Sequence, residues 1–468
     1  MKTTQITFAL YYGNRGFFPG GLIASAREEM KEAVKKAGFG YIEQEASLTR
    51  YGAVETIEEG RLYAEFLKKN RDKYDGVIVC LPNFGDENGA YYALKDAGVP
   101  ILIQAYPDEL GLMDFEHRRD AVCGKIAMCN VLRQAGIKYS LTEKFAVSPL
   151  SDDFAEDLRL FAGTCRAVKG MKEFSIGEIG ARTTAFKTVR IDEIAMQRKK
   201  INVETIDMAH LFDVMDDVNA DELKTKKEYV KNIADFGNYP EIKVENIARL
   251  YVALEKLIKD YNLNALAIRC WNELQLHYGI APCMVMGDLN EKGIVCACET
   301  DVNNAIMMRA LNLSSDRPVM LYDVNNNYAN DEKKCIFFHC GPSPKSMTEG
   351  PLHVEEHLMF KKSYGEGSGV GLAVGKIKIQ EVTIGSVKTE NGKICSFTTE
   401  GRFTDDPVDE AFFGCHCVFE KKNGTANDML NYMSNNGYRH HVAIAAGKWS
   451  KSVREAFDKY LDYETEII

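Results

Sequence analysis

The sequence predicts an α/β fold in which two Rossmann-like parallel-sheet domains are followed by a C-terminal β-rich, barrel-like domain. Up to about residue 315, short apolar segments alternate with amphipathic ones, as in parallel strands joined by helices. Beyond Asp316, alternating segments separated by Asn, Gly and Asp turns indicate an antiparallel sheet. At roughly 100–200 residues per domain, 468 residues allow three domains, placed at 1–140, 141–315 and 316–468.

The first domain is expected to alternate strands and helices. Apolar runs predict strands at 6–12, 41–45, 76–81 and 100–105, and amphipathic segments predict helices at 22–36, 55–69 and 87–96. Arg15 and Asn83 lie in the loops after the first and third of these strands. Because loops at strand ends often carry binding residues, both are candidate substrate contacts, and a solvated Arg15 is the alternative.

A helix over 116–136, ending near Gly136, is expected to link the first two sheets. The second sheet then takes a strand and turn over 174–182 and strands near 202–207, 265–270 and 293–298, with helices at 154–169, 192–200, 221–236 and 244–261. The third domain takes strands at 318–322, 335–339, 373–384, 394–399, 414–420 and 441–446, with helices at 426–433 and 452–460.

Two of the predicted strands end in acidic residues. Glu273 follows the run 265–270, and Glu299 and Asp301 follow the run 293–298. Because ligands of open α/β sheets bind beyond the carboxyl ends of the strands, a pair of carboxylates, one from each segment, is expected to hold a cation or to divide acid and base roles, and Glu273 and Asp301 are the candidates. The alternative is a pair of helix N-termini, capped at Asn272-Glu273 and Thr300-Asp301.

Three histidines lie at the ends of predicted strands. His339 ends the apolar run 335–339 beside Gly341, and His440 and His441 begin the last strand. Together with Glu273 and Asp301 they form an oxygen and imidazole donor set from separated segments. Such a set suits Mn²⁺, Mg²⁺ or Co²⁺ better than an ion bound by thiolates, whereas a lone strand-end histidine is more often only hydrogen-bonded.

Other motifs offer competing functions. His353, Glu356 and His357 fit the H-x-x-E-H pattern of a zinc peptidase, which requires all three on one helix. Cys296-Ala-Cys298 and Cys415-His-Cys417 offer four thiols for a structural zinc but lack the usual C-x-x-C spacing. The glycine-rich stretch 369–375 precedes a strand-like segment instead of a helix, which favours a turn over a dinucleotide loop.

Composition excludes several classes of protein. The net charge of −10, without a basic stripe, disfavours nucleic-acid and anionic-membrane binding. The N-terminus lacks the pattern of a signal peptide, and the chain lacks an apolar run of about 18 residues. Thirteen cysteines, many inside apolar runs, indicate reduced thiols and a cytoplasmic location.

The acidic residues and the run 338–341 (FHCG), considered together, make the chain similar to the L-fucose isomerase-like family, relatives of L-fucose and L-arabinose isomerases. The resemblance also includes 118–124 (RRDAVCG), the turn 177–182 and the pair His440-His441, so it covers nearly the whole chain. It implies three domains, a homo-oligomer such as a hexamer or trimer with sites near subunit interfaces, a Mn²⁺-type cation, and aldose–ketose interconversion through an enediolate.

The resemblance also implies roles for single residues. Glu273 and Asp301 match carboxylates that bind the metal and act at the reacting carbons, and one of His440 and His441 matches a metal ligand. His339 matches a further ligand of the arabinose isomerases and is kept as a substrate contact. Arg15 matches an arginine that contacts substrate across a subunit interface.

The sugar is left open, because the chain is shorter than the fucose isomerases and its loop 12–20 differs from theirs. Relatives of similar length act on sulfonated sugars such as sulfoquinovose, for which Arg15 or Arg182 offers a bidentate guanidinium contact to the sulfonate. A sugar-binding or regulatory protein without catalysis on the same scaffold is the alternative function.

Overall fold

The computed structural model describes residues 5–409 and 411–468. The chain forms two compact units. The N-terminal unit contains the described residues up to Lys169 together with 455–462, and the second unit contains 170–454 and 463–468. The second unit holds both another parallel sheet and a β-rich region, and the sequence-based boundaries near 140 and 315 stay predictions.

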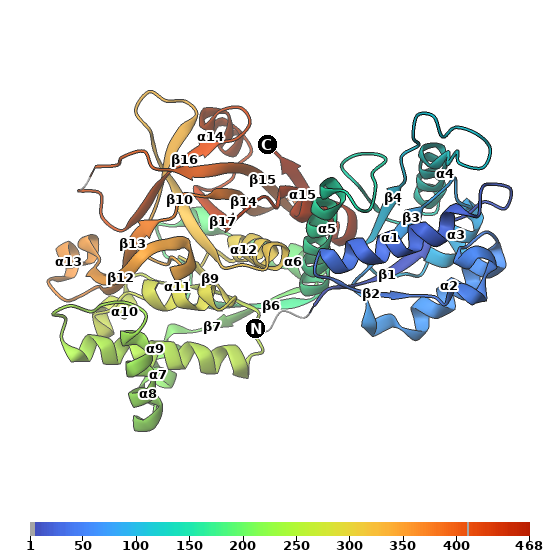
Figure 1. The fold of residues 1–468 in the computed structure, drawn as a ribbon. Helices are drawn as coiled ribbons and strands as arrows, with labels where there is room; N and C mark the ends of the chain where they lie inside the picture. Colours follow the sequence, from blue (N-terminus) through green and yellow to red (C-terminus); the bar gives the residue numbers. More distant parts are fainter. Residues whose placement is uncertain (1–4, 410) are drawn as a thin grey trace. The chain divides into compact units, whose positions relative to one another are not determined.

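The N-terminal unit is built on a parallel sheet with the strand order β2-β1-β3-β4-β5, flanked by helices (Figure 1). Its strands are β1 (Thr7–Tyr12), β2 (Gly40–Glu43), β3 (Gly76–Leu81), β4 (Ile101–Ala105) and β5 (Ser140–Leu141). Its helices are α1 (Leu22–Lys36), α2 (Ile57–Lys69), α3 (Glu87–Leu94), α4 (Ala121–Gln134), α5 (Asp152–Met171, of which 152–169 belong here) and the short turns η1 (Ala46–Leu48), η2 (Arg50–Gly52), η3 (Arg71–Lys73) and η6 (Glu455–Leu461).

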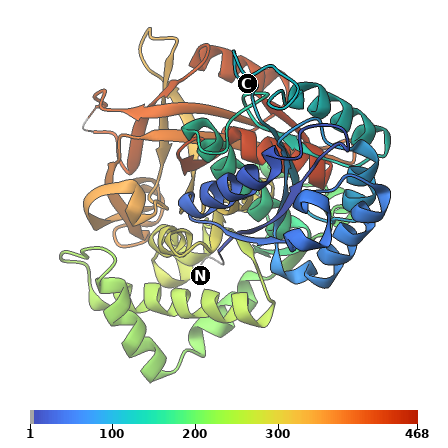
Figure 2. The ribbon, with the colours of Figure 1, turned by 45° about the vertical axis from the view of Figure 1, so that its right-hand side comes forward.

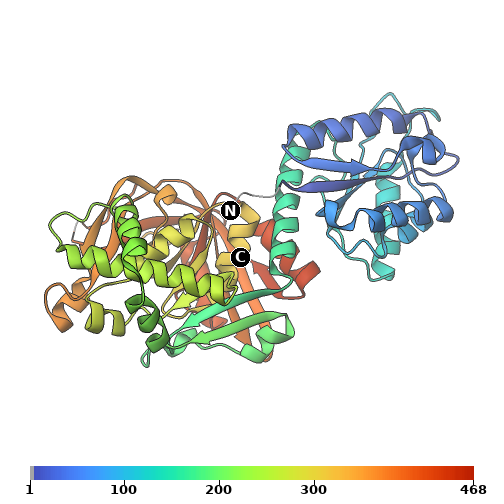
Figure 3. The same ribbon diagram turned by 90° about the horizontal axis from the view of Figure 1, so that it is seen from below.

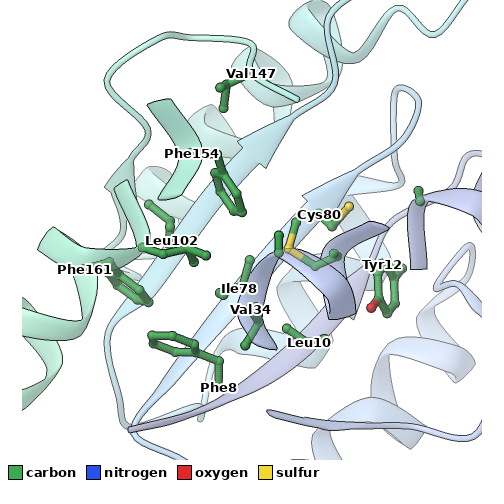
Figure 4. Close-up of a cluster of buried hydrophobic side chains, with 14 of the residues drawn as sticks. Phe8, Leu10, Tyr12, Val34, Ile78, Cys80, Leu102, Val147, Phe154 and Phe161 are labelled. Atoms are coloured by element: carbon green, nitrogen blue, oxygen red, sulfur yellow. The ribbon is translucent and has the colours of Figure 1, made fainter. Parts of the chain in front are cut away.

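Alternation along the strands divides the apolar side chains between the two faces of this sheet. Phe8, Ile78 and Leu102 pack with Phe154 and Phe161 of α5 on the face that α1 also covers (Figure 4). The intervening strand residues pack on α2, α3 and α4 on the opposite face. The sheet is therefore buried on both sides, which explains its nearly continuous apolar strands.

The helix expected to link the two sheets does not do so. Helix α4 packs on the first sheet and leads into β5, which pairs with β4 of the same sheet. The chain instead enters the second unit at the end of α5. The prediction was wrong because the two-residue strand β5 is too short to produce a recognisable apolar run.

The second unit begins with a parallel sheet of order β7-β6-β8-β9. Its strands are β6 (Phe174–Ile179), β7 (Ile201–Ile206), β8 (Ala265–Ile268) and β9 (Val295–Cys298). The helices of this region, several of them visible as the green and yellow group in Figure 3, are η4 (Lys187–Val189), α6 (Glu193–Arg198), α7 (Met208–Asp216), α8 (Ala220–Lys231), α9 (Glu241–Asp260), α10 (Glu273–Tyr278), α11 (Cys283–Glu291) and α12 (Val302–Ser315).

The β-rich region closes into a barrel, because β14 and β15 pair with each other and also end the antiparallel series β14-β17-β10-β11-β16-β15 (Figure 2). The strands are β10 (Val319–Asn327), β11 (Lys334–His339), β14 (Glu381–Glu390), β15 (Lys393–Thr404), β16 (Cys415–Lys421), β17 (His441–Ala446) and β18 (Glu464–Ile467), which joins β15. A separate hairpin and four short helical segments accompany them: β12 (Thr348–Glu356), β13 (Val370–Ile377), η5 (Lys345–Met347), α13 (Leu358–Tyr364), α14 (Ala426–Asn435) and α15 (Ser450–Arg454).

The α/β fold class, with two parallel sheets and a β-rich C-terminal region, is confirmed. The strand predicted at 373–384 was wrong, because the chain leaves the hairpin after Ile377 and enters the barrel at Glu381. The helix predicted at 452–460 ends as α15 at Arg454 and continues as the single-turn π-helix η6.

Candidate active site

The site begins at the carboxyl edge of the second parallel sheet. Strands β6, β8 and β9 are neighbours there, and Ile268 at the end of β8 is paired with Cys298 at the end of β9. The loops that follow these strands carry Arg182, Glu273 and Glu299. The predicted convergence of both acidic segments on one edge is therefore a direct result of parallel pairing.

Glu273 is the first residue of α10. Its Oε2 accepts hydrogen bonds from Arg269 Nε at 2.7 Å and from the Asn272 backbone N–H at 2.8 Å. Arg269 also donates through Nη1 to the carbonyl of Ala181 at 2.9 Å, in the loop after β6. The arginine thus fixes a half-buried carboxylate against the neighbouring loop, which is the kind of support a catalytic group requires.

The second acidic segment combines a backbone kink with a helix cap. Glu299 and Thr300 have φ values of 59° and 58°, so the regular alternation of β9 stops there. Asp301 is the N-cap of α12, and its Oδ1 accepts the Asn304 backbone N–H at 3.1 Å. Thr300 was predicted as the cap of this helix, and this was wrong by one position, because Asp301 is the N-cap. Asn272 is the N-cap of α10 as predicted, although its side chain forms no capping hydrogen bond.

Asp301 is fully buried, and its carboxylate is saturated by protein partners. Arg439 Nη1 lies 3.1 Å from Oδ1, and the Asn304 side-chain amide donates to Oδ2 at 2.7 Å. Although burial opposes ionisation, the charge of Arg439 and the hydrogen bond with His441 lower the pKa of Asp301. Asp301 therefore stays ionised and joins α12 to the barrel.

The barrel contributes the imidazole that faces these carboxylates. His441 begins β17 and is paired with Asp323 of β10. Met320, Tyr322, Val442 and Ile444 fill the barrel interior. Since strand residues alternate in direction, His441 and Asp323 point away from that interior, toward the start of α12.

His441 lies between three carboxylates. Its Nδ1 is 2.9 Å from Asp301 Oδ2, and its Nε2 is 3.1 Å from Glu299 Oε2 and 3.4 Å from Asp323 Oδ1. Burial favours the neutral imidazole, but the hydrogen bonds with Asp301 and Glu299 outweigh it and raise the pKa of His441 to about 10. The protonated imidazole of His441 thus partly neutralises the negative charge of the surrounding carboxylates.

Two buried polar atoms at this position have no hydrogen-bond partner among the described residues: Asp323 Oδ1, whose contact with His441 is not aligned as a hydrogen bond, and His339 Nε2. Burial, followed by repulsion from Glu299 and Asp301, raises the pKa of Asp323 to about 7 against the attraction of His441. Burial also lowers the pKa of His339 to about 4, which keeps this imidazole neutral.

His339 Nδ1 accepts the Cys340 backbone N–H at 2.9 Å, so Nε2 of this neutral ring carries the proton and is a donor. Asp323 Oδ1 is an orphaned buried acceptor, which is costly unless an ion or water satisfies it. Asp323, His440 and His441 each offer a ligand atom, and these atoms lie within 4.8 Å of one another. The excess of carboxylates and the orphaned Asp323 Oδ1 fit a divalent cation with oxygen and imidazole ligands. The residues present are therefore suited to the cation predicted from the sequence.

One aromatic residue connects the sheet edge with the histidines. The ring centroid of Phe186, in the loop after β6, lies 5.8 Å from that of Trp271 and 5.5 Å from those of both His440 and His441. His440 is partly exposed, and its Nε2 lies 3.8 Å from Asp323 Oδ1. Burial lowers the pKa of His440 to about 4. Phe186 thus packs on both parts of the site.

The other residues predicted to contact substrate lie partly in the second unit and partly in the N-terminal unit. Arg182 lies on the loop after β6 and donates through Nη1 to the carbonyl of Thr183 at 3.0 Å, so the guanidinium is held by its own loop. Arg15 and Asn83 lie in the N-terminal unit, after the neighbouring strands β1 and β3. The order β2-β1-β3 reverses direction at this pair, which is where open α/β sheets bind ligands.

Around that switch point Asn83 is fully buried, and its Oδ1 accepts the backbone N–H of Gly85 at 3.2 Å. Its side-chain amide donates to Asn14 and to the carbonyl of Pro19. Arg15 forms an ion pair with Glu87 and lies over the ring of Phe84, 4.0 Å from its centroid. The two residues therefore share one cluster of loops.

The competing motifs are not supported. His353 and Glu356 lie on strand β12 and His357 is the N-cap of α13, so no helix carries the three residues and the zinc-peptidase hypothesis is wrong. Among the described residues, the groups with metal-ligand spacing do not combine Cys296 and Cys298 with Cys415 and Cys417. The glycine-rich stretch is not a dinucleotide loop, but the predicted turn was also wrong, because residues 370–375 lie within strand β13 (Val370–Ile377).

Several residues of the site were missed by sequence analysis: Asp323, Asn304, Arg439 and Phe186. Asp323 lies in the middle of an ordinary β10 segment, and the single available signal is an acidic residue after the apolar run 319–322. Arg439 directly precedes the histidine pair. Asn304, three residues after Asp301, is recognisable only once Asp301 is known to cap a helix.

Two sequence profiles of known protein families match parts of this chain. The sequence profile described as "Fucose/sulfoquinovose isomerase, N-terminal domain" matches residues 9–172, and the profile "L-fucose isomerase, C-terminal domain" matches residues 337–468. The chain is 24% identical over 399 residues to a sulfoquinovose isomerase of Alkalicoccus urumqiensis, covering 83% of this chain and 85% of the relative. It is 23% identical over 419 residues to a sulfoquinovose isomerase of Priestia megaterium, covering 88% and 90%.

The fold, the two profile matches and the site define an enzyme of the aldose–ketose isomerase class. The chain belongs to the L-fucose isomerase-like family, as its sequence motifs predicted. Among the described residues, no helix is long and apolar enough to cross a membrane.

Proposed function

We propose that this enzyme is a divalent-cation-dependent isomerase that converts a sulfonated aldohexose, sulfoquinovose, into its ketose, 6-deoxy-6-sulfofructose. The observation that carries the proposal is the group Glu299, Asp323 and His441, in which three separate segments bring oxygen and imidazole donors together, one of them the unpartnered Asp323 Oδ1. The relatives named sulfoquinovose isomerase, which align over most of their length, support the choice of sugar.

The residues proposed to hold the cation are Glu273, Glu299, Asp323 and His441, with His440 at the margin. A ligand role for Asp301, which the family resemblance implies, stays a prediction. Its complete set of protein partners supports a positioning role instead, since it orients His441 through Nδ1. Mn²⁺ is the proposed ion, with Mg²⁺ and Co²⁺ as alternatives.

Isomerisation moves a proton between C1 and C2 of the open-chain sugar and develops negative charge on O1 and O2. A bound divalent cation supplies positive charge for these oxygens. Glu273 is the proposed base, because Arg269 and Asn272 hold its Oε2 in place and Oε1 remains to take the proton. Glu299 is proposed to handle the proton of the neighbouring hydroxyl.

The sulfonate is proposed to bind an arginine. Arg182 is anchored on the loop after β6, in the same unit as Glu273. Arg15 lies at the switch point of the other sheet beside Asn83, and the resemblance to the family assigns it to the site of a neighbouring subunit. A planar guanidinium suits the trigonal arrangement of sulfonate oxygens, and this contact favours a sulfonated sugar over a neutral one.

A homo-oligomer, hexameric or trimeric, is the proposed assembly. The N-terminal unit exposes several large apolar side chains on the segment after β4, namely Leu110, Leu112, Met113 and Phe115. Exposed apolar groups of this kind are typical of protein–protein contacts. The cytoplasmic location stays a prediction, and the free cysteines agree with it.

Metal dependence and sugar conversion are measured on the same protein preparation. The full chain is dialysed against a chelator, Mn²⁺, Mg²⁺, Co²⁺ or Zn²⁺ is added back, and ketose formation is followed with sulfoquinovose, L-fucose and L-arabinose. Conversion of sulfoquinovose that requires an added cation is the expected result. Conversion unaffected by the chelator, or restricted to a neutral sugar, contradicts the proposal.

The alternative is a sugar-binding protein without catalysis on the same scaffold. It predicts that sulfoquinovose raises the melting temperature equally with and without chelator, while no ketose forms. A melting scan on the same samples therefore separates the two functions.

A further inference from the structure

Two cysteine thiols meet beneath the proposed active site. Cys298 is the last residue of β9, and Cys270 lies two residues beyond the end of β8, the neighbouring parallel strand. Their Sγ atoms are 3.3 Å apart and hydrogen-bonded, and both side chains are buried. Because both cysteines are free, the two thiols remain available as ligands.

A carboxylate completes this group. Glu299 follows Cys298 directly, and neighbouring residues of a regular strand point to opposite faces. The φ of 59° at Glu299 ends that alternation, and a carboxylate oxygen of Glu299 lies within 4.8 Å of both Sγ atoms. Three ligand atoms of two chemical types are therefore directed to one place.

We propose that Cys270, Cys298 and Glu299 form a second cation site that selects a thiophilic ion such as Zn²⁺ or Cd²⁺. Thiolate sulfur prefers these ions to Mn²⁺ or Mg²⁺, and zinc also accepts carboxylate oxygen. Binding replaces the two thiol protons, which are released to solvent, by the ion. Its two thiol ligands are not part of the oxygen and imidazole group Asp323, His440 and His441.

The two sites share Glu299, and this has a functional consequence that rests on the proposed function. The Glu299 carboxylate contacts His441 Nε2 at 3.1 Å in the absence of any ion. A thiophilic ion at the cysteines takes this carboxylate away from the site assigned to Mn²⁺. Occupation of the thiol site therefore inhibits isomerisation. Mn²⁺ activates the enzyme, whereas a thiophilic ion such as Cd²⁺ inhibits it.

Binding is tested with Cd²⁺ alone on the reduced, chelator-treated full chain. The readout is the ultraviolet charge-transfer absorption of Cd²⁺–thiolate bonds, which does not depend on turnover. The wild type is expected to develop this band with the first equivalent of Cd²⁺, and Cys270→Ser and Cys298→Ser are each expected to lose most of it. Cys335→Ser, at an equally buried position in barrel strand β11, is the matched control and retains the band.

Circular dichroism first establishes that each variant is folded, and Cys270→Ala and Cys298→Ala replace any serine variant that is not. A wild-type protein without the band overturns the proposal, as does an equal band in the wild type and both folded cysteine variants.

Inhibition is tested on the Mn²⁺-restored enzyme. The Cd²⁺ concentration that halves the rate is expected to rise at least about tenfold in the Cys270 and Cys298 variants, and to stay unchanged in Cys335→Ser. Equal inhibition of all variants, together with a thiol-dependent band, overturns the sharing of Glu299. If no sugar is converted at all, the proposed function fails, and the absorption experiment still decides whether the thiol site exists.

Discussion

His441 Nδ1 and Asp301 Oδ2 lie 2.9 Å apart although 140 residues separate them in the chain. One belongs to the first residue of barrel strand β17 and the other to the N-cap of α12, which follows the parallel sheet. Asn304 strengthens the same junction, because its side chain donates to Asp301 Oδ2 and to the carbonyl of His441, and accepts from Ser386 and Val387 of β14. The barrel and the sheet therefore meet where the site is formed.

Replacing His441 by alanine is expected to destabilise the protein by about 3–5 kcal/mol. The reason is that the buried carboxylates of Asp301 and Glu299 lose the protonated imidazole that neutralises their charge. Urea unfolding of the chelator-treated protein measures the loss. His440→Ala is the matched control, since its side chain is 43% exposed, and it is expected to cost less than about 1 kcal/mol. Similar losses for the two variants would show that His441 does not hold this junction together.

Glu273→Gln and Glu299→Gln are each expected to lower the turnover number by about 10²–10⁴ while the melting temperature changes little, since a proton-transferring carboxylate is removed and shape is kept. Turnover is measured with sulfoquinovose at saturating Mn²⁺. The control is Glu366→Gln, whose carboxylate is 84% exposed beyond α13. Full activity in either active-site variant removes that residue from the proton transfer.

Asp323→Asn is expected to preserve or raise the stability of the metal-free protein, because burial disfavours the charge of this carboxylate, with repulsion from Glu299 and Asp301 adding to the effect and attraction by His441 opposing it, and because its Oδ1 has no hydrogen-bond partner in the described chain. The same change is expected to reduce the stabilisation by Mn²⁺ by about 1.4–2.7 kcal/mol, equivalent to a ten- to hundredfold loss of affinity. Unfolding with and without Mn²⁺ measures both effects. A variant that loses metal-free stability and keeps its Mn²⁺ response contradicts a ligand role.

Gly124→Ala is expected to disturb the switch point of the N-terminal sheet. A Cβ at Gly124 in α4 would lie 1.8 Å from the backbone oxygen of Phe84, next to Asn83. The clash is between the backbone of Phe84 and a Cβ fixed to the backbone of α4, so it is relieved only if one of these two segments moves. We expect a raised KM for the sugar with an unchanged Mn²⁺ requirement. Gly16→Ala is the control, because no atom lies within 4 Å of its added Cβ. An unchanged KM in a folded Gly124→Ala enzyme argues against a substrate contact at Arg15 or Asn83.

Local patterns were sufficient for much of the fold. The helix at 22–36 and the strand at 76–81 have the predicted bounds, because amphipathic spacing and a fully apolar run each specify one element. Strand β5, with two residues, and the break between β13 and β14 were not predictable, since no local period marks them.

The sequence by itself determined the family, the α/β class, and the acidic and histidine residues at the ends of strands. Only the tertiary structure decided which partners each of these residues contacts, and so which role each is proposed to have. Asp301 and Glu299 look alike two positions apart, yet the cap of α12 directs Asp301 to Arg439 and the kink at Glu299 directs its carboxylate toward His441 and the two thiols. Asp323 joins them because antiparallel pairing places it opposite His441. Pairings between distant strands leave no local periodicity, so they become visible only when the chain is folded.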